Sequence, residues 1–551
     1  MAIIDDAVAW RDADPDPDTR QELTELIEAT DSPDPERSRP AVDEIERAFA
    51  GPLQFGTAGL RGRLGPGPGR MNRVVVTQAA AGFARWLTEQ GLAGGKVIVG
   101  YDARHKSAEF ALDTAQVFAG AGFEVLLTDE PTPTPVVVFG IQHYGCVAGV
   151  VVTASHNPPA DNGYKVYLGD GSQIVPPTDA QIAAHIADVA QGAWATLPRS
   201  EARIVVGDDL RAAYVARLQQ IIPAESPKDL VWVHTAMHGV GARVVRESAA
   251  ALGFPKPVEV AEQSAPDPDF PTVAFPNPEE KGAIDLALSL ASHEDADVVI
   301  ANDPDADRCA VAAKVDGQWR MLTGDELGSL LGDDAIRRGV PGTFANSVVS
   351  STLLGTMARA AGRDHTTTLT GFKWIGRVPD LAFGYEEAIG YCCDSRAVPD
   401  KDGISAAMTV LRIVGELKAE GRTLSHRLDD IARTHGLHAT SQLAVRVEEL
   451  SIIADAMARL RGNPPATLLG DPVVVTDLAL GKSDLPPTDG IELTGDRLHV
   501  VARPSGTEPK LKCYLEVRMP PADDVRAARA EAADLLAELR REMAEALGVD
   551  A

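Results

Sequence analysis

Residues 151–165 read VVTASHNPPADNGYK, in which an apolar run leads directly into a serine. Ser155 is followed by His156, Asn157 and two prolines, and Lys165 lies downstream. A strand that ends in small polar residues and prolines predicts a rigid loop at a sheet edge, where α/β proteins place reactive groups. Ser155 is therefore a candidate nucleophile. The alternative is that its hydroxyl only satisfies backbone groups in a turn.

A second group of residues has the composition of a metal site. Asp303, Asp305 and Asp307 stand at alternate positions of NDPDADR, just after an apolar run. Three carboxylates held together repel one another unless a cation neutralises them. A calcium EF-hand loop is excluded, because its sixth position would be Arg308 and its twelfth Lys314. The pattern favours Mg²⁺, and the alternative is a solvated acidic turn.

Near the C-terminus, RPSGTEPKLK has the residue types of a phosphate-binding loop. Arg503 offers a planar fork, Ser505 and Thr507 offer hydroxyl donors, and Gly506 allows backbone N–H groups to approach an anion. The Walker pattern does not occur there. The alternative is a polar turn between two prolines.

Two further segments are weaker signals. FGTAGLRGRLG presents Arg61 on what we expect to be a flexible glycine-rich loop. FGYEEAIGY places Glu386 and Glu387 between glycines, where carboxylates suit sugar hydroxyls, although a surface acidic turn is an equal alternative. A histidine next to a serine points elsewhere in most backbone conformations. We therefore expect His156 to be a hydrogen-bond partner of phosphate or backbone, and Lys165 to serve charge stabilisation or proton transfer.

The elements that position these residues alternate along the chain. Helical patterns such as QAAAGFARWLTEQ alternate with β-branched runs such as KVIVGYD, which predicts βαβ units and mostly parallel sheets. After about residue 441, short strands with turn signals precede a charged helix, which indicates an α+β domain with an antiparallel sheet. Residues 1–50 hold a predicted helix, QELTELIEAT, between two proline-broken stretches.

This organisation predicts three consecutive α/β domains with mixed, mostly parallel sheets, followed by an α+β domain, arranged around a central cleft. The predicted boundaries are a helical extension at 1–50, α/β domains at 51–207, 208–323 and 324–440, and the α+β domain at 441–551.

Composition narrows the class of protein. Lys and Arg total 52 against 80 Asp and Glu in 551 residues, and the net charge of −28 argues against nucleic acid or an anionic membrane as a partner. Five cysteines without CxxC spacing indicate neither a zinc site nor a disulfide framework, and fit a reducing compartment. No secretory signal or membrane-spanning run is present in this sequence, so we expect a cytoplasmic protein.

A serine nucleophile, a carboxylate-bound Mg²⁺ and a separate phosphate loop fit phosphoryl transfer. Esterase chemistry would need G-x-S-x-G around the serine, and that pattern does not frame Ser155.

Four motifs occur in the order found in one known family: TASHNP (153–158), DPDADR (303–308), GYEEAIG (384–390) and RPSGTEPK (503–510). In this the sequence resembles the α-D-phosphohexomutase superfamily of phosphoglucomutases and phosphomannomutases, from FGTAGLRG to the C-terminal domain. The resemblance implies four domains around a central cleft. It also implies an isomerase that interconverts hexose 1-phosphate and hexose 6-phosphate, with glucose or mannose as the sugar, as a monomer or dimer.

The resemblance further implies that Ser155 carries a phosphoryl group, that a sugar 1,6-bisphosphate serves as primer, and that Asp303, Asp305, Asp307 and the phosphoserine hold Mg²⁺. Arg61, Lys165 and Arg308 would support the reacting end, and TGFKWIG would distinguish the two sugar orientations. The residues implied to bind substrate are Arg308, Gly371, Lys373, Glu386, Ala388, Arg503, Ser505, Gly506, Thr507 and Lys510.

One position departs from the family pattern. Many hexomutases have a serine where this sequence has Ala388, and that serine binds a sugar hydroxyl. EEAIG followed by DKDG (400–403) resembles the branch that includes phosphopentomutase and glucose bisphosphate synthase. Those activities are the alternatives, together with a non-catalytic phosphosugar-binding protein, which would be expected to have lost Ser155 or the aspartates.

Overall fold

The computed structural model describes residues 2–56, 58–192, 196–447, 450–482, 485–504 and 510–549. Its backbone contacts divide the chain into two compact units. The first consists of Met1–Cys309 and Arg396–Met408, and the second of Ala310–Ser395 and Thr409–Ala551.

The first unit begins with three helices that share a small apolar core around Ala7, Leu23 and Ile45. The helix predicted at 21–30 is confirmed as part of α2. The proline-broken stretches on either side are helix starts, because Asp16 and Asp34 cap helices that have proline in the first turn. The helices are α1 (Ala2–Ala13), α2 (Pro17–Thr30) and α3 (Pro35–Phe49).

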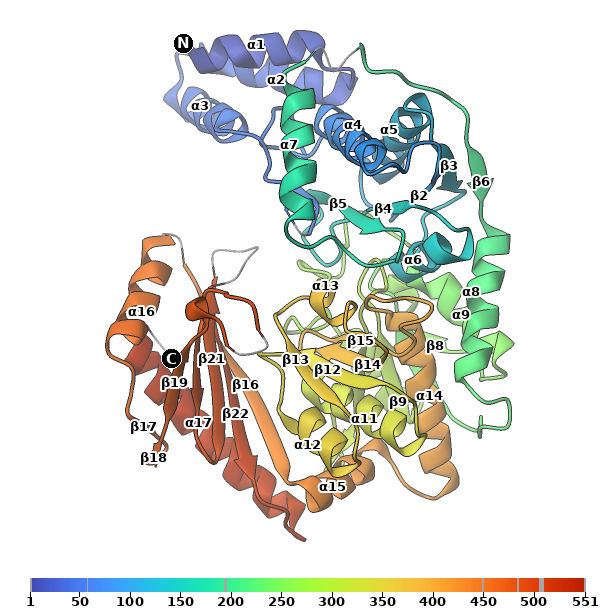
Figure 1. The fold of residues 1–551 in the computed structure, drawn as a ribbon, viewed down its shortest axis with the longest axis vertical. Coiled ribbons are helices and arrows are strands. Elements are labelled where there is room, and N and C mark those ends of the chain that lie inside the picture. Colours follow the sequence, from blue (N-terminus) through green and yellow to red (C-terminus); the bar gives the residue numbers. More distant parts are fainter. Residues whose placement is uncertain are drawn as a thin grey trace. The chain divides into compact units, whose positions relative to one another are not determined.

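A six-stranded mixed sheet in the order β1-β5-β4-β2-β3-β6 follows. Strands β2, β3, β4 and β6 are parallel, and β5 joins β4 and β1 antiparallel. Helices α4, α5 and α7 cover one face and α6 the other (Figure 1). The strands are β1 (Leu60–Arg63), β2 (Lys96–Tyr101), β3 (Glu124–Thr128), β4 (Ala148–Val152), β5 (Asp161–Leu168) and β6 (Ile204–Val206). The helices are α4 (Arg73–Glu89), α5 (Ser107–Gly120), α6 (Thr134–His143) and α7 (Thr178–Ala190).

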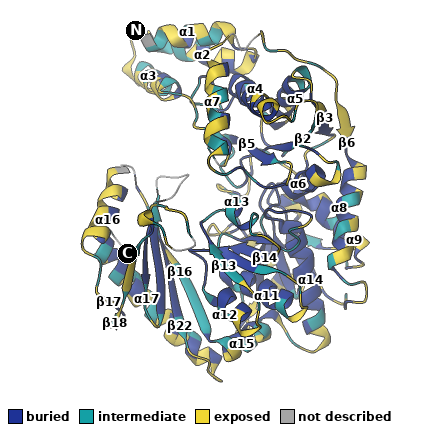
Figure 2. Ribbon diagram, viewed as in Figure 1, coloured by how far each residue is buried: buried dark blue, intermediate teal, exposed yellow. Residues whose placement is uncertain are grey.

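The sequence of β4, AGVVV, is apolar throughout because the strand lies inside this sheet with both faces covered, and all five of its residues are buried (Figure 2). The chain emerging from its end therefore starts from a rigid base.

The rest of the first unit contains the parallel strands β7, β8 and β9. Their elements are α8 (Asp208–Ile221), β7 (Trp232–Thr235), α9 (Gly241–Ala251), β8 (Val258–Glu259), the 3₁₀ turn η2 (Ala261–Gln263), α10 (Asp285–His293) and β9 (Val298–Ala301). Helix α14 (Gly403–Ala419) begins in the first unit and ends in the second.

The described part of the second unit holds two larger sheets, the short antiparallel pair β17–β18, and the strands β10 and β11. The sheet β13-β12-β14-β15 is mixed, and β10 and β11 form an antiparallel hairpin. The elements here are β10 (Ala310–Val315), β11 (Gln318–Met321), α11 (Gly324–Arg337), β12 (Thr343–Ser347), α12 (Leu353–Ala360), β13 (His365–Thr368), α13 (Phe372–Ile375), β14 (Leu381–Glu386), β15 (Gly390–Cys392) and α15 (Leu424–His435).

The last sheet, β16-β22-β21-β20-β19, is antiparallel throughout, as predicted for the C-terminal region. Helices α16 and α17 share an apolar core with it. The elements of this part of the chain are β16 (Leu437–Arg446), α16 (Leu450–Gly462), β17 (Thr467–Leu468), β18 (Asp471–Pro472), β19 (Val474–Asp477), η3 (Leu478–Leu480), β20 (Ile491–Thr494), β21 (Leu498–Pro504), β22 (Lys510–Met519) and α17 (Val525–Leu547), of which β17 and β18 pair only with each other.

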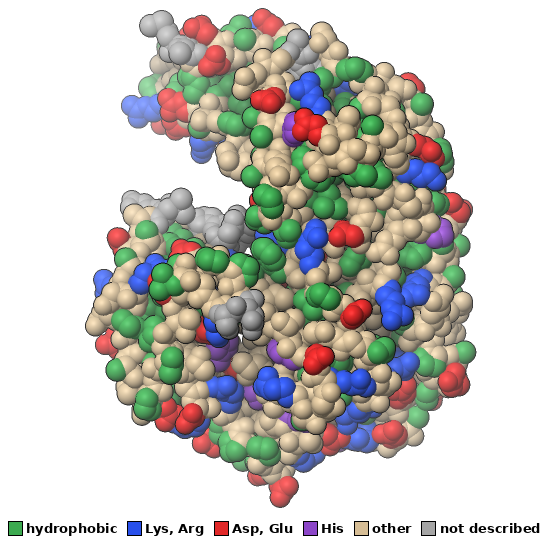
Figure 3. All heavy atoms as spheres, viewed as in Figure 1, with side chains coloured by type: hydrophobic (Ala, Val, Ile, Leu, Met, Phe, Trp, Pro, Cys, Tyr) green, Lys and Arg blue, Asp and Glu red, His purple; other side chains and the backbone are tan. Residues whose placement is uncertain are grey.

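Among the described residues, no helix is both long and apolar enough to cross a membrane. On the face shown in Figure 3, acidic and basic side chains are interspersed.

Candidate active site

Ser155 follows β4 in a constrained turn. Its backbone φ of 51° is left-handed, and its N–H donates to Thr153 Oγ1 at 2.8 Å. The side chain is buried, and its Oγ donates to Asp303 Oδ2 at 2.8 Å. A strained, non-glycine residue at the end of a central strand is a recurrent feature of functional sites.

His156 lies closer to Ser155 than we expected. Its Nδ1 is 3.3 Å from Ser155 Oγ, so the expectation that the histidine points elsewhere is wrong. The left-handed φ of Ser155 is the reason, because it brings the two neighbouring side chains to the same side. Burial, together with the positive charges of Arg308 and Arg61, lowers the pKa of His156 well below its usual value, which keeps the imidazole neutral.

Asp303, Asp305 and Asp307, here called the aspartate triad, follow β9. All three are fully buried, and one carboxylate oxygen from each lies within 4.8 Å of the others. Burial raises the pKa of Asp303 well above its ordinary value, and the charges of its two neighbours add to the effect. The triad is therefore no solvated acidic turn, and it has the repulsion that a cation relieves.

Lys165, on β5, joins the triad from the neighbouring sheet. Its Nζ donates to Asp305 Oδ2 at 2.6 Å and to Asp307 Oδ2 at 2.7 Å. Burial acts to lower the pKa of Lys165, but the charges of the two aspartates outweigh it, and the pKa is raised. Lys165 is thus held as a cation, which favours charge stabilisation over proton transfer.

The remaining oxygens of the triad fit a metal ion. The Oδ1 atoms of Asp305 and Asp307 are buried and have no hydrogen-bond partner among the described residues. Leaving buried carboxylate oxygens unpaired is costly, and oxygen-only donors suit a hard cation such as Mg²⁺. The residues present therefore fit the metal predicted from the sequence.

Arg61 and Arg308 bring further positive charge to the site. Arg61 lies on β1, which pairs with β5, so the expected flexible loop is wrong for this residue. Its Nη1 donates to Asn157 Oδ1 at 3.2 Å. The backbone N–H of Arg308 donates to Asp303 Oδ1 at 3.0 Å, and its Nε lies 3.9 Å from Asp307 Oδ1.

Arg104, which our sequence reasoning missed, bonds the backbone of the loop that carries Ser155. Its guanidinium donates to the carbonyl oxygens of Ser155 at 2.6 Å, Asn157 at 2.5 Å, Pro158 at 2.8 Å and Asp161 at 3.2 Å. The residue is buried, and its Nε lies 3.3 Å from Asp102 Oδ2. The signal that could have found it is its position just after β2, a parallel neighbour of β4.

Thr134 and Lys401 were also missed. Thr134 Oγ1 donates to Asp305 Oδ2 at 2.6 Å, and Lys401 Nζ lies 3.4 Å from Asp307 Oδ2. Lys401 belongs to the DKDG segment that the sequence had singled out only as a family mark. A lysine between two aspartates could have been assigned as a counter-charge.

The second unit holds the predicted sugar loop. Glu386 ends β14 and is buried, and Ala388 lies in the turn before β15. The Glu387 carboxylate accepts hydrogen bonds from Ser347 Oγ at 3.1 Å and Ser350 Oγ at 3.3 Å, and its N–H donates to Ser350 Oγ at 3.1 Å. Two hydroxyls, one from the last residue of β12 and one from the loop after it, thus stand next to this glutamate.

The other predicted binding residues also lie in the second unit. Gly371, with φ of 108°, precedes the short helix α13, which contains Lys373. Arg503 lies on β21 and Lys510 begins β22, which pairs with it. The predicted phosphate-binding residues Ser505, Gly506 and Thr507 lie outside the described residues.

Comparison with known families gives four matches in chain order. They are to phosphoglucomutase/phosphomannomutase α/β/α domain I at residues 52–193, domain II at 212–317, domain III at 323–435, and the C-terminal domain at 443–545. The predicted fold class, with four domains and mixed sheets, is confirmed. The residue boundaries drawn from the sequence remain predictions.

Individual relatives carry different names. A "probable phosphomannomutase" of Haemophilus influenzae is 46% identical over 81% of this chain and 93% of its own length. The human phosphopentomutase is 35% identical over 87% of each chain, and a Staphylococcus aureus phosphoglucomutase is 32% identical over 88% of this chain and 92% of its own. The structure of pp63/parafusin, a phosphoglucomutase from Paramecium, aligns with a TM-score of 0.70 at 19% identity, covering 92% of this chain and 97% of that one, and shows the fold alone.

Proposed function

Because the chain belongs to the phosphoglucomutase/phosphomannomutase family, we propose that it interconverts hexose 1-phosphate and hexose 6-phosphate, with glucose or mannose as the sugar. Family membership makes it a phosphosugar mutase, an isomerase that works by phosphoryl transfer. The choice of sugar and the roles of individual residues are our proposal.

The hydrogen bond from Ser155 Oγ to Asp303 Oδ2, at 2.8 Å, carries this proposal. It joins the predicted phosphate carrier to the predicted metal ligands in the absence of any ligand. Lys165, across Asp305 and Asp307, adds a fixed positive charge beside them.

In the proposed cycle, Ser155 begins as a phosphoserine. The bond between Oγ and phosphorus breaks as a bond forms from phosphorus to the free hydroxyl oxygen of the sugar monophosphate, and the proton of that hydroxyl passes to Oγ. The resulting bisphosphate reorients, and its other phosphoryl group returns to Oγ. Lys165, Arg61 and Arg308 stabilise the charge on the transferring group, and the neutral His156 supplies a hydrogen bond at Oγ.

Asp303, Asp305, Asp307 and a phosphoserine oxygen would hold Mg²⁺. When bound, this ion neutralises charge on the transferring phosphoryl group. The Oδ1 atoms of Asp305 and Asp307, which accept no hydrogen bond from the described residues, support this assignment.

For the substrate, we propose that Glu386 and the serines around Glu387 face sugar hydroxyls, and that Gly371 and Lys373 distinguish the two orientations. Arg503, Ser505, Gly506, Thr507 and Lys510 would hold the phosphate that does not react. A sugar 1,6-bisphosphate would act as primer. A cytoplasmic location also remains a proposal, and it agrees with five cysteines that form no disulfide.

Ala388 favours a second candidate, a phosphopentomutase. The human relative with that name is 35% identical to this chain, and the serine expected at this position in many hexomutases is missing. Glucose bisphosphate synthesis on the same scaffold is a further variant. The intact serine and triad count against a non-catalytic binding protein.

The test is mutase turnover of glucose 1-phosphate, mannose 1-phosphate and ribose 1-phosphate side by side, with Mg²⁺ and the matching bisphosphate primer. We expect a hexose to be preferred, and the Ser155→Ala variant to be inactive. Mass spectrometry of the peptide containing Ser155 should show one added phosphoryl group in the wild type.

Preference for ribose 1-phosphate would replace the hexose proposal with the pentose one. Full activity of Ser155→Ala would overturn both, because each requires a phosphoserine.

A further inference from the structure

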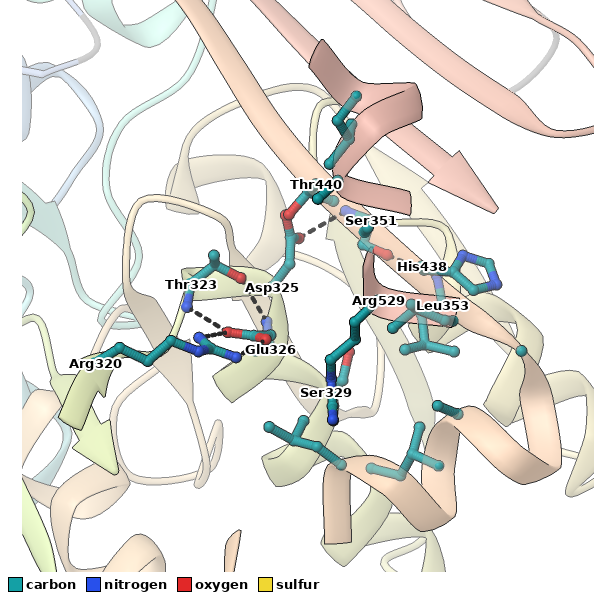
Figure 4. Close-up of a pocket in the computed structure, with 18 residues that line it drawn as sticks. Arg320, Thr323, Asp325, Glu326, Ser329, Ser351, Leu353, His438, Thr440 and Arg529 are labelled. Atoms are coloured by element: carbon teal, nitrogen blue, oxygen red, sulfur yellow. Dashed lines mark hydrogen bonds and ion pairs between the residues drawn. The ribbon is translucent and has the colours of Figure 1, made fainter. Parts of the chain in front are cut away.

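The second unit contains a cavity of about 200 Å³ that the proposed reaction does not use (Figure 4). It is lined by residues of β11, α11, the start of α12, α15, the first residues of β16, and α17. A cavity of about 150 Å³ can hold a benzene ring, so this one has room for a ring with a short substituent.

Much of the wall is apolar. Leu353, Leu428 and Ile431 are buried, and Leu536 is partly buried. These side chains come from three helices, and they would pack against the hydrocarbon body of a ligand rather than select a charged one.

Two polar side chains on α11, Asp325 and Ser329, stand in the wall, and one oxygen atom of each has no hydrogen-bond partner among the described residues. Asp325 is 7% exposed, and both of its hydrogen bonds, from Ser351 N–H at 2.7 Å and Tyr385 OH at 3.0 Å, go to Oδ1. Its Oδ2 has no partner among the described residues. Ser329, one turn later on the same helix face, is 1% exposed, and its Oγ is also unpaired within the described part of the chain. Of the two, Ser329 Oγ is a buried polar atom without a partner, and such an atom deserves an explanation, for which a ligand in the cavity is one.

The charges around Asp325 are negative. Glu387 and Glu516 lie near enough to disfavour its ionised form, and we call these three the carboxylate cluster. Glu516 is held by Ser351 Oγ at 2.6 Å, by Thr352, and by His438 Nδ1 at 3.1 Å.

The two arginines that line the cavity do not make the charge around Asp325 positive. Arg320 pairs with Glu326 at 2.6 Å, and Arg529 pairs with Asp429 at 2.5 Å. Each pair is close to neutral, so the field at Asp325 Oδ2 favours a cation with N–H donors.

From this geometry we propose that the cavity binds a small organic cation, an amine or amidine on an apolar body, whose N–H groups bond Asp325 Oδ2 and Ser329 Oγ. Burial raises the pKa of Asp325 to about 7, so such a ligand would find a carboxyl that it can ionise.

The site is linked to the predicted sugar loop through two short paths. Tyr385, which bonds Asp325, directly precedes Glu386 on β14. Ser351, which also bonds Asp325, follows Ser350, which holds Glu387.

The test is titration of benzylamine into the full-length protein, followed by calorimetry and by the shift in the thermal unfolding midpoint. We expect saturable binding with one site. Asp325→Asn should weaken it at least tenfold and Ser329→Ala a few-fold, while toluene, which lacks the amine, should bind more weakly. Asp364→Asn removes an exposed acid of the same unit outside the cavity and should leave binding unchanged.

The affinity should also rise with pH as Asp325 ionises. Absence of saturable binding, equal affinity of wild type and Asp325→Asn, or toluene binding as tightly as benzylamine would each overturn the proposal. If Asp325→Asn does not fold, the affinity of Ser329→Ala for benzylamine tests the proposal in its place. None of these readouts needs turnover, so they stand apart from the tests of the mutase.

Discussion

Each of the two units holds a group of buried or partly buried carboxylates, and the partners of these carboxylates differ between the units. The carboxylates of the aspartate triad form ion pairs with lysine and arginine side chains, and Lys165 Nζ bonds two of them. The carboxylates of the carboxylate cluster instead form hydrogen bonds with hydroxyls, backbone N–H groups and His438. Fixed cations suit a site that handles phosphoryl charge, whereas hydroxyl partners suit recognition of neutral sugar groups.

Replacing Lys165, the lysine bonded to the aspartate triad, should lower kcat more than the other changes described below. We expect Lys165→Met to lower kcat roughly 10³-fold, because a preorganised charge at the reacting centre is lost. It also leaves Asp305 and Asp307 without this partner, which should destabilise the protein by about 3 kcal/mol. Steady-state kinetics and chemical unfolding measure the two effects.

Lys96→Met is the matched control, because the Lys96–Glu124 ion pair at 4.0 Å is exposed and should contribute little. If Lys165→Met kept a tenth of the wild-type kcat, the cations would not be what distinguishes the triad from the carboxylate cluster.

The second largest loss of activity should follow from removing the contacts of Arg104 with the Ser155 loop. Arg104→Ala removes the donor to the backbone carbonyls of the Ser155 loop, and we expect kcat to fall about 10²-fold with KM nearly unchanged, because a displacement of 1 Å can cost that much. Phosphorylation of Ser155 by the bisphosphate primer should slow in parallel, and Arg104→Lys should restore part of both.

Arg211→Ala is its control, since Arg211 is equally buried but pairs with Asp129 and Asp208 away from the serine loop. Equal losses of kcat in the two variants would reduce Arg104 to a stabilising residue.

Arg104 also shows what the sequence could and could not predict. Ser155 and the triad were predictable because strand ends that carry several polar residues have distinctive patterns, and the four ordered motifs identified the family. Arg104 acts through backbone carbonyls of a loop some fifty residues away, and no local pattern reports such a contact.

Geometry at single residues was the other limit. The contact between Ser155 and His156 depends on one left-handed φ, which a sequence does not reveal for a non-glycine residue. Arg61 was assigned to a flexible loop because its neighbours are glycines, whereas pairing of β1 with β5 fixes it. The cavity of the second unit is lined from six separate elements and had no sequence signal.

The carboxylate cluster should make the free energy of unfolding depend on pH, because its partners are hydroxyls, N–H groups and a histidine rather than lysines or arginines. Burial raises the pKa of Asp325 to about 7, above its value in the unfolded chain. Between these two values the folded state binds the proton more tightly, so this group lowers the stability progressively as pH rises towards 7, after which the loss is constant.

Asp325→Asn should therefore be more stable than the wild type at pH 8, by on the order of 2 kcal/mol, and the difference should vanish towards pH 4. Denaturant unfolding of both proteins at the two pH values measures this. A difference that stays the same across the range would show that Asp325 is not the titrating group, and Asp364→Asn, at an exposed site, should show no gain.

The smallest effect concerns the hydroxyls at Glu387. Ser350→Ala removes one donor to its carboxylate and the acceptor for its N–H, and we expect KM for the sugar phosphate to rise roughly threefold to tenfold while kcat changes little. Ser248→Ala, which removes a buried hydroxyl without a partner in the described part of the chain, should leave KM unchanged.

Kinetics of Ser350→Ala, Glu387→Gln and the double variant then separate two ways in which the serine could act. If Ser350 works by orienting Glu387, the double variant should be little worse than Glu387→Gln alone, because residues in one hydrogen-bonded group are not additive. Additive losses would mean that the Ser350 hydroxyl bonds the sugar itself and takes the place of the serine missing at Ala388. In that case, the neutral partners of the carboxylate cluster would themselves belong to substrate recognition.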